Sequence, residues 1–410
     1  MKKRYVVLAA SCIVNMFIGI TYCWAVFSAG FMNEEIFGAT VAASTLAWAF
    51  SLNTGVGPIT MITGGAIRKK LGGVGNVVKL SAVLNLIGLL LVALVPKLPV
   101  LYIGFGILAG FGVGMTNGIT TTNTGLWFPE KRGTIAGTTT AFFGLGSIIW
   151  PFVLRPMVGS IGIQKTILIF AIIIGVVQFI CGFFISTPPE GWVPDGFKAP
   201  APGAKAPTTK NYTWREMIAD PRYYLAVIAF LFFSAAGLFV IQSGKTMATD
   251  IGGIAADAAL ATYTVSFIGI GNSGGRLLWG AISDKIGRYP SLMIMGALVC
   301  LAGFGLTLVN GSYVLFLILV LIIAACYGGS MGIYPALTAD NFGPKNNGIN
   351  YGVMFIGFAL GGFVGPIFFS KLRELTSGFG LPLTIVAVMG ALALVLIAIL
   401  TKLRASKNKA

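Results

Sequence analysis

The stretch from Ala258 to Ser283 reads AALATYTVSFIGIGNSGGRLLWGAIS, and its only charged residue is Arg276. A helix needs about 20 mostly apolar residues to cross a bilayer, so this stretch is long enough to do so. Arg276 lies eight residues before Asp284, which is about 12 Å along a helix and well inside the hydrocarbon layer. An arginine there costs roughly 2.5 kcal/mol or more unless it faces a protein interior or a watery cavity. Because its planar fork of donors matches a carboxylate, we expect Arg276 to bind an anion.

The composition is that of a membrane protein. Of 410 residues, 56% are hydrophobic and 10% are charged, whereas soluble domains carry about 25% charged residues. Span length and the lack of alternation favour helices over strands. The sequence therefore predicts an all-α membrane protein with twelve transmembrane helices, near residues 5–30, 42–66, 76–95, 100–126, 134–157, 164–186, 223–247, 258–282, 290–309, 313–338, 348–370 and 382–402.

The positive charges are unevenly distributed. Most of the 28 Lys and Arg residues behind the net charge of +16 fall at one set of loop ends, together with both termini. Cytoplasmic loops of membrane proteins carry such an excess, so we expect both termini in the cytoplasm. This placement also argues against a nucleic-acid-binding surface, which the net charge alone would suggest.

The two halves of the chain repeat at a constant offset of 215 residues. GAIRKKLG at Gly65–Gly72 recurs as GAISDKIG at Gly280–Gly287, and the further pairs are Gly133 with Gly348, Gly137 with Gly352, Gly146 with Gly361, and Pro151 with Pro366. We interpret this as a duplication, with pseudo-symmetric six-helix halves at residues 1–186 and 223–410. Residues 187–222 are expected to form a cytoplasmic linker and a short interfacial helix. Transporters built from two parallel repeats bind their substrate between them near the midplane.

Several other functions are disfavoured. The chain has no histidine, and its five cysteines lie in apolar spans without metal-ligand spacing, so we expect no metal site and no cofactor. The Gly269–Gly274 stretch matches G-x-G-x-x-G, but a mid-membrane helix lacks the strand that a dinucleotide site requires. Because no G-x-x-x-x-G-K-[ST] phosphate loop occurs either, we expect secondary transport rather than an enzyme or an ATP-driven pump.

The stretch GAISDKIGR resembles the loop motif G-x-x-x-D-x-x-G-R of the major facilitator superfamily. The resemblance implies a gating motif made of Gly280, Asp284, Gly287 and Arg288. The first-half copy departs from the motif, since Lys69 stands where the acid is expected. The stretches WFPEKRG, PPEGW, YCW and NYGV are similar to the oxalate/formate antiporter family, which includes pyruvate and lactate carriers. This similarity implies a bacterial or archaeal inner membrane.

In that family a span-eight arginine binds the substrate carboxylate, and Arg276 matches it. The oxalate antiporter has a second cation, a span-eleven lysine, where this chain has Phe358. One cation suits a monocarboxylate such as lactate, pyruvate, formate or acetate. By the same resemblance, the rest of the pocket lining is Tyr22, Asn117, Phe143, Tyr327, Met331 and Phe355. Tyr and Asn side chains can hydrogen-bond an α-hydroxyl or keto oxygen.

The sequence leaves the coupling mode open. A buried titratable acid is the usual proton carrier, but the acids of this chain lie near span ends, as Asp257 does. We expect proton-coupled symport by a monomer. The alternatives are anion exchange and, in a different class, a membrane sensor that binds a carboxylate without moving it.

Overall fold

The computed structural model describes residues 2–37, 41, 43–189, 192–194, 210–255, 259–363, 365, 368–376 and 378–407. In chain order its elements are α1 (Lys2–Ile18), η1 (Gly19–Cys23), α2 (Trp24–Asn33), α3 (Ala43–Gly55), α4 (Gly57–Ile67), α5 (Val74–Leu94), α6 (Leu98–Leu101), η2 (Tyr102–Ala109), α7 (Gly110–Trp127), η3 (Pro129–Lys131), α8 (Arg132–Ile161), α9 (Ile163–Phe184), α10 (Trp214–Ile218), α11 (Pro221–Asp250), α12 (Ala259–Ile286), α13 (Arg288–Leu308), α14 (Tyr313–Phe342), α15 (Asn347–Met354), α16 (Ile356–Phe363), α17 (Phe369–Thr376) and α18 (Gly380–Lys407). The described part of the chain is thus helical, as expected.

Within the described residues, nine helical segments are long and apolar enough to cross a membrane. The other three predicted spans correspond to α3 with α4, to α12, and to α15 with α16. The first of these is interrupted at Val56, just before Pro58 in the first turn of α4, because proline cannot continue the hydrogen bonding of a preceding helix. α15 ends at Met354, and Phe355 separates it from α16. α12 is continuous and carries Arg276.

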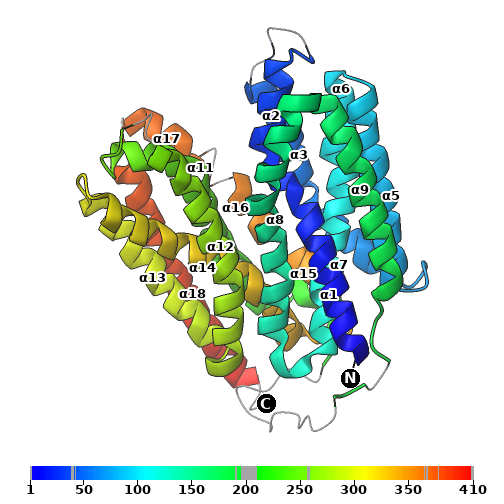
Figure 1. Cartoon of the computed structure of the whole chain (residues 1–410). Coiled ribbons are helices and arrows are strands. Elements are labelled where there is room, and N and C mark those ends of the chain that lie inside the picture. The colour runs from blue at the N-terminus through cyan, green and yellow to red at the C-terminus, as the bar shows by residue number, and fades with distance from the viewer. Residues whose placement is uncertain are drawn as a thin grey trace.

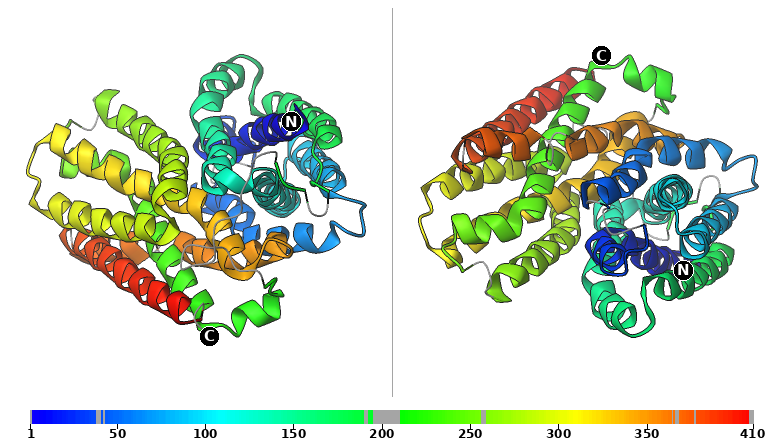
Figure 2. Two further views of the ribbon diagram at one scale, coloured as in Figure 1. Left: turned by 90° about the horizontal axis from the view of Figure 1, so that it is seen from below. Right: turned by 90° about the horizontal axis from the view of Figure 1, so that it is seen from above.

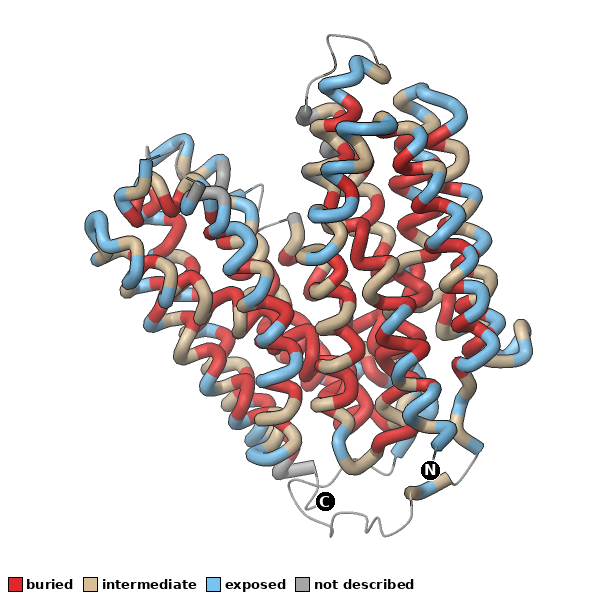
Figure 3. The backbone as a smooth tube through the Cα atoms, in the orientation of Figure 1, coloured by how far each residue is buried: buried red, intermediate tan, exposed pale blue. Residues whose placement is uncertain are grey.

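The helices form two bundles, α1–α9 and α11–α18, which lie side by side with both termini at the same end of the molecule (Figure 1). Views along the bundles show the two halves as separate groups that touch along their inner helices (Figure 2). Buried residues fill the interior of each half, and exposed ones lie on its outside (Figure 3). Large apolar side chains are among the exposed ones, such as Phe152 at 77%. Extensive apolar surface of this kind is suited to lipid.

Glycines from the duplicated motifs form the contact between the halves. A Cβ atom added to Gly280 of α12 would overlap the carbonyl of Gly133 on α8. In the equivalent place of the repeat, a Cβ on Gly65 of α4 would lie 2.8 Å from the carbonyl carbon of Gly348 on α15. Small residues let helix backbones approach this closely. The 215-residue offset therefore corresponds to a two-fold pseudo-symmetry in which α8 packs on α12 as α15 packs on α4. Pro366 of the predicted repeat lies outside the described residues.

The segment in which an interfacial helix was predicted contains the short helix α10. It begins with a capping box, in which the Thr213 side chain accepts from the Glu216 N–H and the Glu216 carboxylate accepts from the Thr213 N–H. The preceding segment is tied to the second half, since the Tyr212 N–H donates to the carbonyl of Phe342, at 2.8 Å. The capping box stops α10 from extending backwards into the linker.

Candidate functional site

Arg276 lies on the inner side of α12, at the contact between the two halves, and is 3% exposed. Its Nε donates to Asn272 Oδ1 at 3.3 Å, and its Nη1 donates to the carbonyl oxygen of Thr140 on α8 at 3.0 Å. No ion pair of Arg276 occurs among the described residues. Arginine has five N–H donors, and the acceptors of these two hydrogen bonds are both neutral. The site therefore holds a buried positive charge without a protein counter-charge in the described part of the chain.

Three tyrosines lie near this cation. The side chain of Tyr22 interacts with Arg276 and with Tyr327 of α14. Tyr351 of α15 is also close enough to interact electrostatically with Arg276. Phe143 of α8 contacts the Tyr22 ring edge-on, with centroids 4.9 Å apart. The four residues come from both halves, so the cation lies in a polar, aromatic environment between them.

The position of Tyr22 depends on a local break in the first span. The chain leaves α1 at Ile18 and follows the 3-10 segment η1 before α2 begins. Gly19 at the start of η1 is pressed against the carbonyl of Phe143, where a Cβ atom would overlap. Tyr22 lies within this segment. A 3-10 segment is more tightly wound than an α-helix, so its side chains point in different directions from those of a continuous α-helix. This close approach brings Tyr22 to Phe143 and Arg276.

Phe355 and Phe358 form an apolar wall. Their rings stack with centroids 4.4 Å apart, and both are buried. Phe355 also contacts the ring of Tyr351 at 5.7 Å, which links this wall to the tyrosines. Phe358, which the resemblance aligns with the second cation of the oxalate antiporter, is thus a buried aromatic side chain in this protein.

The remaining two predicted residues lie at the edges of this group. Met331 is buried on α14, one turn beyond Tyr327, and the backbone of its neighbour Gly332 packs against the Arg276 carbonyl. Asn117 of α7 is half-buried, and its amide donates to Asn15 of α1 at 3.0 Å. Asn117 thus contacts the first span rather than the aromatic group itself.

Sequence reasoning missed two contributors to the site. Tyr351 belongs to the NYGV stretch, which carried the family resemblance, and its place within that motif is the signal that could have identified it. Thr140 contributes a backbone carbonyl, which no side-chain pattern could reveal.

The predicted gating motif joins the two halves at the end that carries the termini. The Asp284 carboxylate accepts from the backbone N–H groups of Gly133 and Thr134, at 2.9 and 2.6 Å, in the first turn of α8. Helix N-termini favour such anions because their N–H groups lack partners and the helix dipole is positive there. The contact between Gly280 and Gly133 lets α12 and α8 come close enough for these hydrogen bonds. Gly287, with a φ of +102°, begins the turn into α13.

Further charges complete this network. Arg288 pairs with Asp284 and, at 3.1 Å, with Asp340 of α14. Arg132 at the start of α8 reaches the same Asp340 at 3.2 Å. Asp340, one of the acids near a span end, is buried between two arginines of different halves. At the pseudo-equivalent interface of α4 and α15, Lys69 stands in the position of Asp284, so the network belongs to one side of the molecule.

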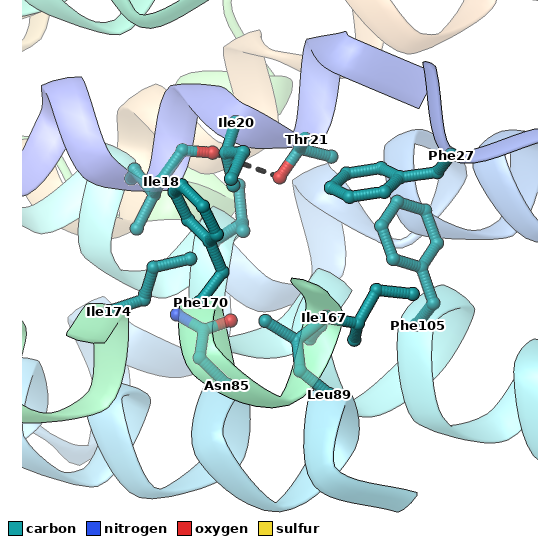
Figure 4. A pocket seen from close by; sticks show the side chains of 12 residues that line it. Ile18, Ile20, Thr21, Phe27, Asn85, Leu89, Phe105, Ile167, Phe170 and Ile174 are labelled. Atoms are coloured by element: carbon teal, nitrogen blue, oxygen red, sulfur yellow. Dashed lines mark hydrogen bonds between the residues drawn. The ribbon is translucent and has the colours of Figure 1, made fainter. Parts of the chain in front are cut away.

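A cavity lies elsewhere, inside the first half (Figure 4). It is bordered mainly by apolar side chains, including Ile18, Phe27, Phe105 and Phe170, with Asn85 and Thr21 as its polar members. The Thr21 hydroxyl already donates to the Ile18 carbonyl. This lining offers no charge to an anion. Among the described residues, His, Cys, Asp and Glu form no group of three that would hold a metal ion.

Comparisons with known proteins agree with this architecture. The profile of the Major Facilitator Superfamily matches residues 8–366 and, in a second alignment, 245–410. The chain is 28% identical over 361 residues to the uncharacterized MFS-type transporter YhjX of Escherichia coli (strain K12), covering 88% of this chain and 86% of that protein. It is 28% identical over 357 residues to the oxalate:formate antiporter of Oxalobacter formigenes, covering 85% and 79%.

The fold is also similar to a crystal structure of the transporter FucP in the outward conformation. The TM-score is 0.73 at 13% sequence identity, covering 97% of this chain and 99% of that one. The profile match, the full-length relatives and the shared fold together show that the chain belongs to the Major Facilitator Superfamily and is a multi-pass membrane transporter, not an enzyme.

Proposed function

We propose that this protein is a secondary carrier of small monocarboxylate anions, of the lactate, pyruvate, formate or acetate type. The observation that carries the proposal is Arg276, a buried cation with neutral partners among the described residues. The stacked Phe355 and Phe358 stand where a second cation would be needed for a dicarboxylate. One positive charge in the site matches one negative charge on the substrate.

The guanidinium supplies two parallel N–H donors to the two carboxylate oxygens of the substrate. The hydroxyls of Tyr22 and Tyr327 can hydrogen-bond the substituent next to the carboxylate. The wall of Phe355 and Phe358 contacts the short carbon chain and excludes water. Binding thus pairs the buried cation with an anion, and the loaded site becomes electrically neutral. A neutral loaded site lowers the cost of occluding the charge between the two halves.

Alternating access follows from this arrangement, because the site lies between two bundles that touch through glycines and one ionic network. Opening toward the termini requires Asp284 to release the first turn of α8, and requires Arg132 to separate from Asp340. Rocking of one repeat against the other would do both at once. By the distribution of Lys and Arg, we place the termini in the cytoplasm and the protein in the inner membrane of a bacterial or archaeal cell.

The function is tested by uptake of labelled lactate, pyruvate, formate and acetate into proteoliposomes that contain the purified protein. Accumulation inside the vesicles supports a carrier. Saturable binding of these anions without accumulation identifies a sensor instead, and neither binding nor uptake excludes the proposed substrate class.

Coupling is tested in sealed proteoliposomes with an alkaline interior and no internal substrate. We expect uptake that a protonophore collapses, because proton symport lets the carrier return empty. Uptake that requires preloaded substrate and ignores the pH gradient would establish exchange. Asp257, the acid that could move inward to carry the proton, lies outside the described residues.

Replacing Tyr327 with Phe is expected to weaken binding of 2-hydroxy and 2-oxo acids more than binding of acetate. One lost hydrogen bond is worth about 1 kcal/mol, or about fivefold in apparent KM. Tyr334→Phe is the matched control, because Tyr334 is buried on the same helix but donates to the Ala226 carbonyl. Equal effects of Tyr327→Phe on all three acids would show that its hydroxyl does not contact the substrate.

Replacing Phe358 with Lys is expected to reduce lactate transport and to allow competition by oxalate. A second buried cation without a second anion is an unpaired charge, which costs several kcal/mol. The measurement is inhibition of labelled lactate uptake by oxalate in both proteins. If oxalate competes with lactate equally well in the parent protein, the match between one cation and one negative charge is wrong.

A further inference from the structure

A small cavity lies between the two halves, on the side of Arg276 that faces the termini. It is bordered by α7 and α8 of the first half and by α14 and α15 of the second, and its polar members include Thr121, Arg132 and Asn347. Arg132 begins α8, eight residues before Thr140, whose carbonyl accepts from Arg276. Arg132 therefore lies about 12 Å from the level of the central cation, measured along this helix.

The 215-residue repeat places this cavity on the pseudo-two-fold axis. Arg132 and Asn347 are equivalent positions of the two halves, as are Thr121 and Ala336, and all four border the cavity. Equivalent residues can share one small cavity only if the axis that relates them passes through it or close to it. Transporters of two parallel repeats bind and release substrate between the halves, along this axis. The cavity thus lies on the path from the central site to the side of the termini.

Three buried polar atoms that border the cavity have no hydrogen-bond partner among the described residues. They are Thr121 Oγ1, Arg132 Nε and Asn347 Oδ1. Thr121 is 1% exposed and Asn347 is 4% exposed. The Asn347 amide is oriented by its Nδ2, which donates to the Pro335 carbonyl at 3.2 Å. Because buried polar groups are nearly always hydrogen-bonded, these atoms indicate a site for a polar group, and the cavity has room for about one group the size of water.

The charges around Arg132 change when the halves separate. In the described part of the chain, Asp340 is the acid that pairs with Arg132, at 3.2 Å. Asp340 also pairs with Arg288, at 3.1 Å, and these two residues both belong to the second half. Opening toward the termini therefore leaves Asp340 with Arg288 but separates Arg132 from its acid. Because an arginine stays charged, Arg132 then needs another anion.

We propose that Arg132 forms a second carboxylate-binding site, which becomes available when the path opens toward the termini. This inference rests on the proposed monocarboxylate function and adds a binding step to it. The Arg132 guanidinium and the Thr121 hydroxyl donate to the carboxylate oxygens of the substrate, and Asn347 Oδ1 accepts from a water that hydrates the anion. While the path is closed on this side, Asp340 occupies the guanidinium instead.

The test measures the apparent KM for lactate from each side of the membrane, in right-side-out and inside-out vesicles from the same cells. Accessibility of a C-terminal tag identifies the side of the termini. On that side, Arg132→Gln should raise the KM about 3- to 10-fold, because the carboxylate loses a charge-assisted hydrogen bond in hydrated surroundings. Arg132→Lys keeps the charge and should give a smaller increase.

Asp340→Asn is the matched control, because it breaks the same ion pair but keeps the Arg132 cation. Arg288 retains Asp284 as its partner in this variant. Loss of the pair favours the state that is open toward the termini, and a larger population of that state lowers the apparent KM there. We therefore expect Asp340→Asn not to raise the KM on this side. A residue that only holds the path closed would give the same result in both variants.

Thr121→Val separates a direct contact from a change in the overall charge. The hydroxyl that it removes has no partner among the described residues, so the variant should be as stable as the parent. It should raise the KM about 2- to 10-fold on the side of the termini and leave the KM on the opposite side unchanged.

Three outcomes overturn the inference: a KM on the side of the termini that Arg132→Gln does not raise, one that Asp340→Asn raises equally, or one that Thr121→Val does not change. If Arg132→Gln does not fold, Thr121→Val alone decides. A parent protein that transports no monocarboxylate from either side refutes the proposed function itself, which is a different result from transport that is insensitive to these variants.

Discussion

Arg276→Gln and Arg276→Lys are both expected to abolish monocarboxylate transport while the protein still inserts into the membrane. Gln removes the charge. Lys keeps the charge but replaces the planar fork by a single ammonium, which cannot form two parallel hydrogen bonds with a carboxylate. Truncating one partner of a buried, hydrogen-bonded charge pair costs about 2–5 kcal/mol, or at least about 30-fold in affinity. The measurement is labelled lactate or pyruvate uptake at matched protein amounts.

Arg373→Gln is the matched control. The same Arg-to-Gln substitution is made here at a residue that forms a partly exposed ion pair with Asp250, away from the pocket. Exposed ion pairs contribute about 1 kcal/mol or less, so this variant should transport like the parent. Parental uptake by Arg276→Gln would show that the buried cation has a structural role and that the substrate binds elsewhere.

Gly137→Ala is expected to reduce transport strongly, although it adds one methyl group. Gly137 of α8 lies against α12, and its added Cβ would overlap the Arg276 carbonyl oxygen and lie 3.1 Å from the carbonyl carbon. The obstacle is backbone, so α8 and α12 must separate by the width of the methyl group. Overpacking of this kind costs about 1–3 kcal/mol, and here it would also displace Arg276, the residue proposed to bind the substrate. Uptake and thermal unfolding of the detergent-solubilised protein are the measurements.

Gly159→Ala tests whether a glycine-to-alanine substitution in α8 is enough by itself to reduce transport. Gly159 is exposed on the same helix, and a Cβ there would meet no heavy atom within 4 Å. Alanine has a higher helix propensity than glycine by about 1 kcal/mol, so this variant should be as active as the parent and at least as stable. Normal transport by Gly137→Ala would mean that the halves do not approach this closely in the working protein.

The apolar composition, the span lengths and the 215-residue repeat are sufficient to predict an all-helical membrane protein of two related halves. The sequence can reveal these features because, in lipid, every backbone N–H and C=O group must be hydrogen-bonded within its own helix. A long apolar run therefore predicts a transmembrane helix. Arg276 stands out for the same reason: a charge inside an apolar span is costly and must have a partner or a function. The lack of histidine and of a phosphate loop in the sequence likewise disfavours imidazole chemistry and ATP-driven pumping.

The contacts of the site were decided only by the tertiary structure. Arg276 meets a backbone carbonyl of Thr140, which any residue could supply, and Tyr351 joins the group because α15 packs against the first half. Tyr22 reaches the site because Gly19 permits a close contact where the first span becomes a 3-10 segment. Asp340, which lies near the end of a span, is buried between arginines of two halves. Spacing along one helix predicts which residues share a face, but contacts between helices depend on how the two bundles pack, and this is a property of the folded chain.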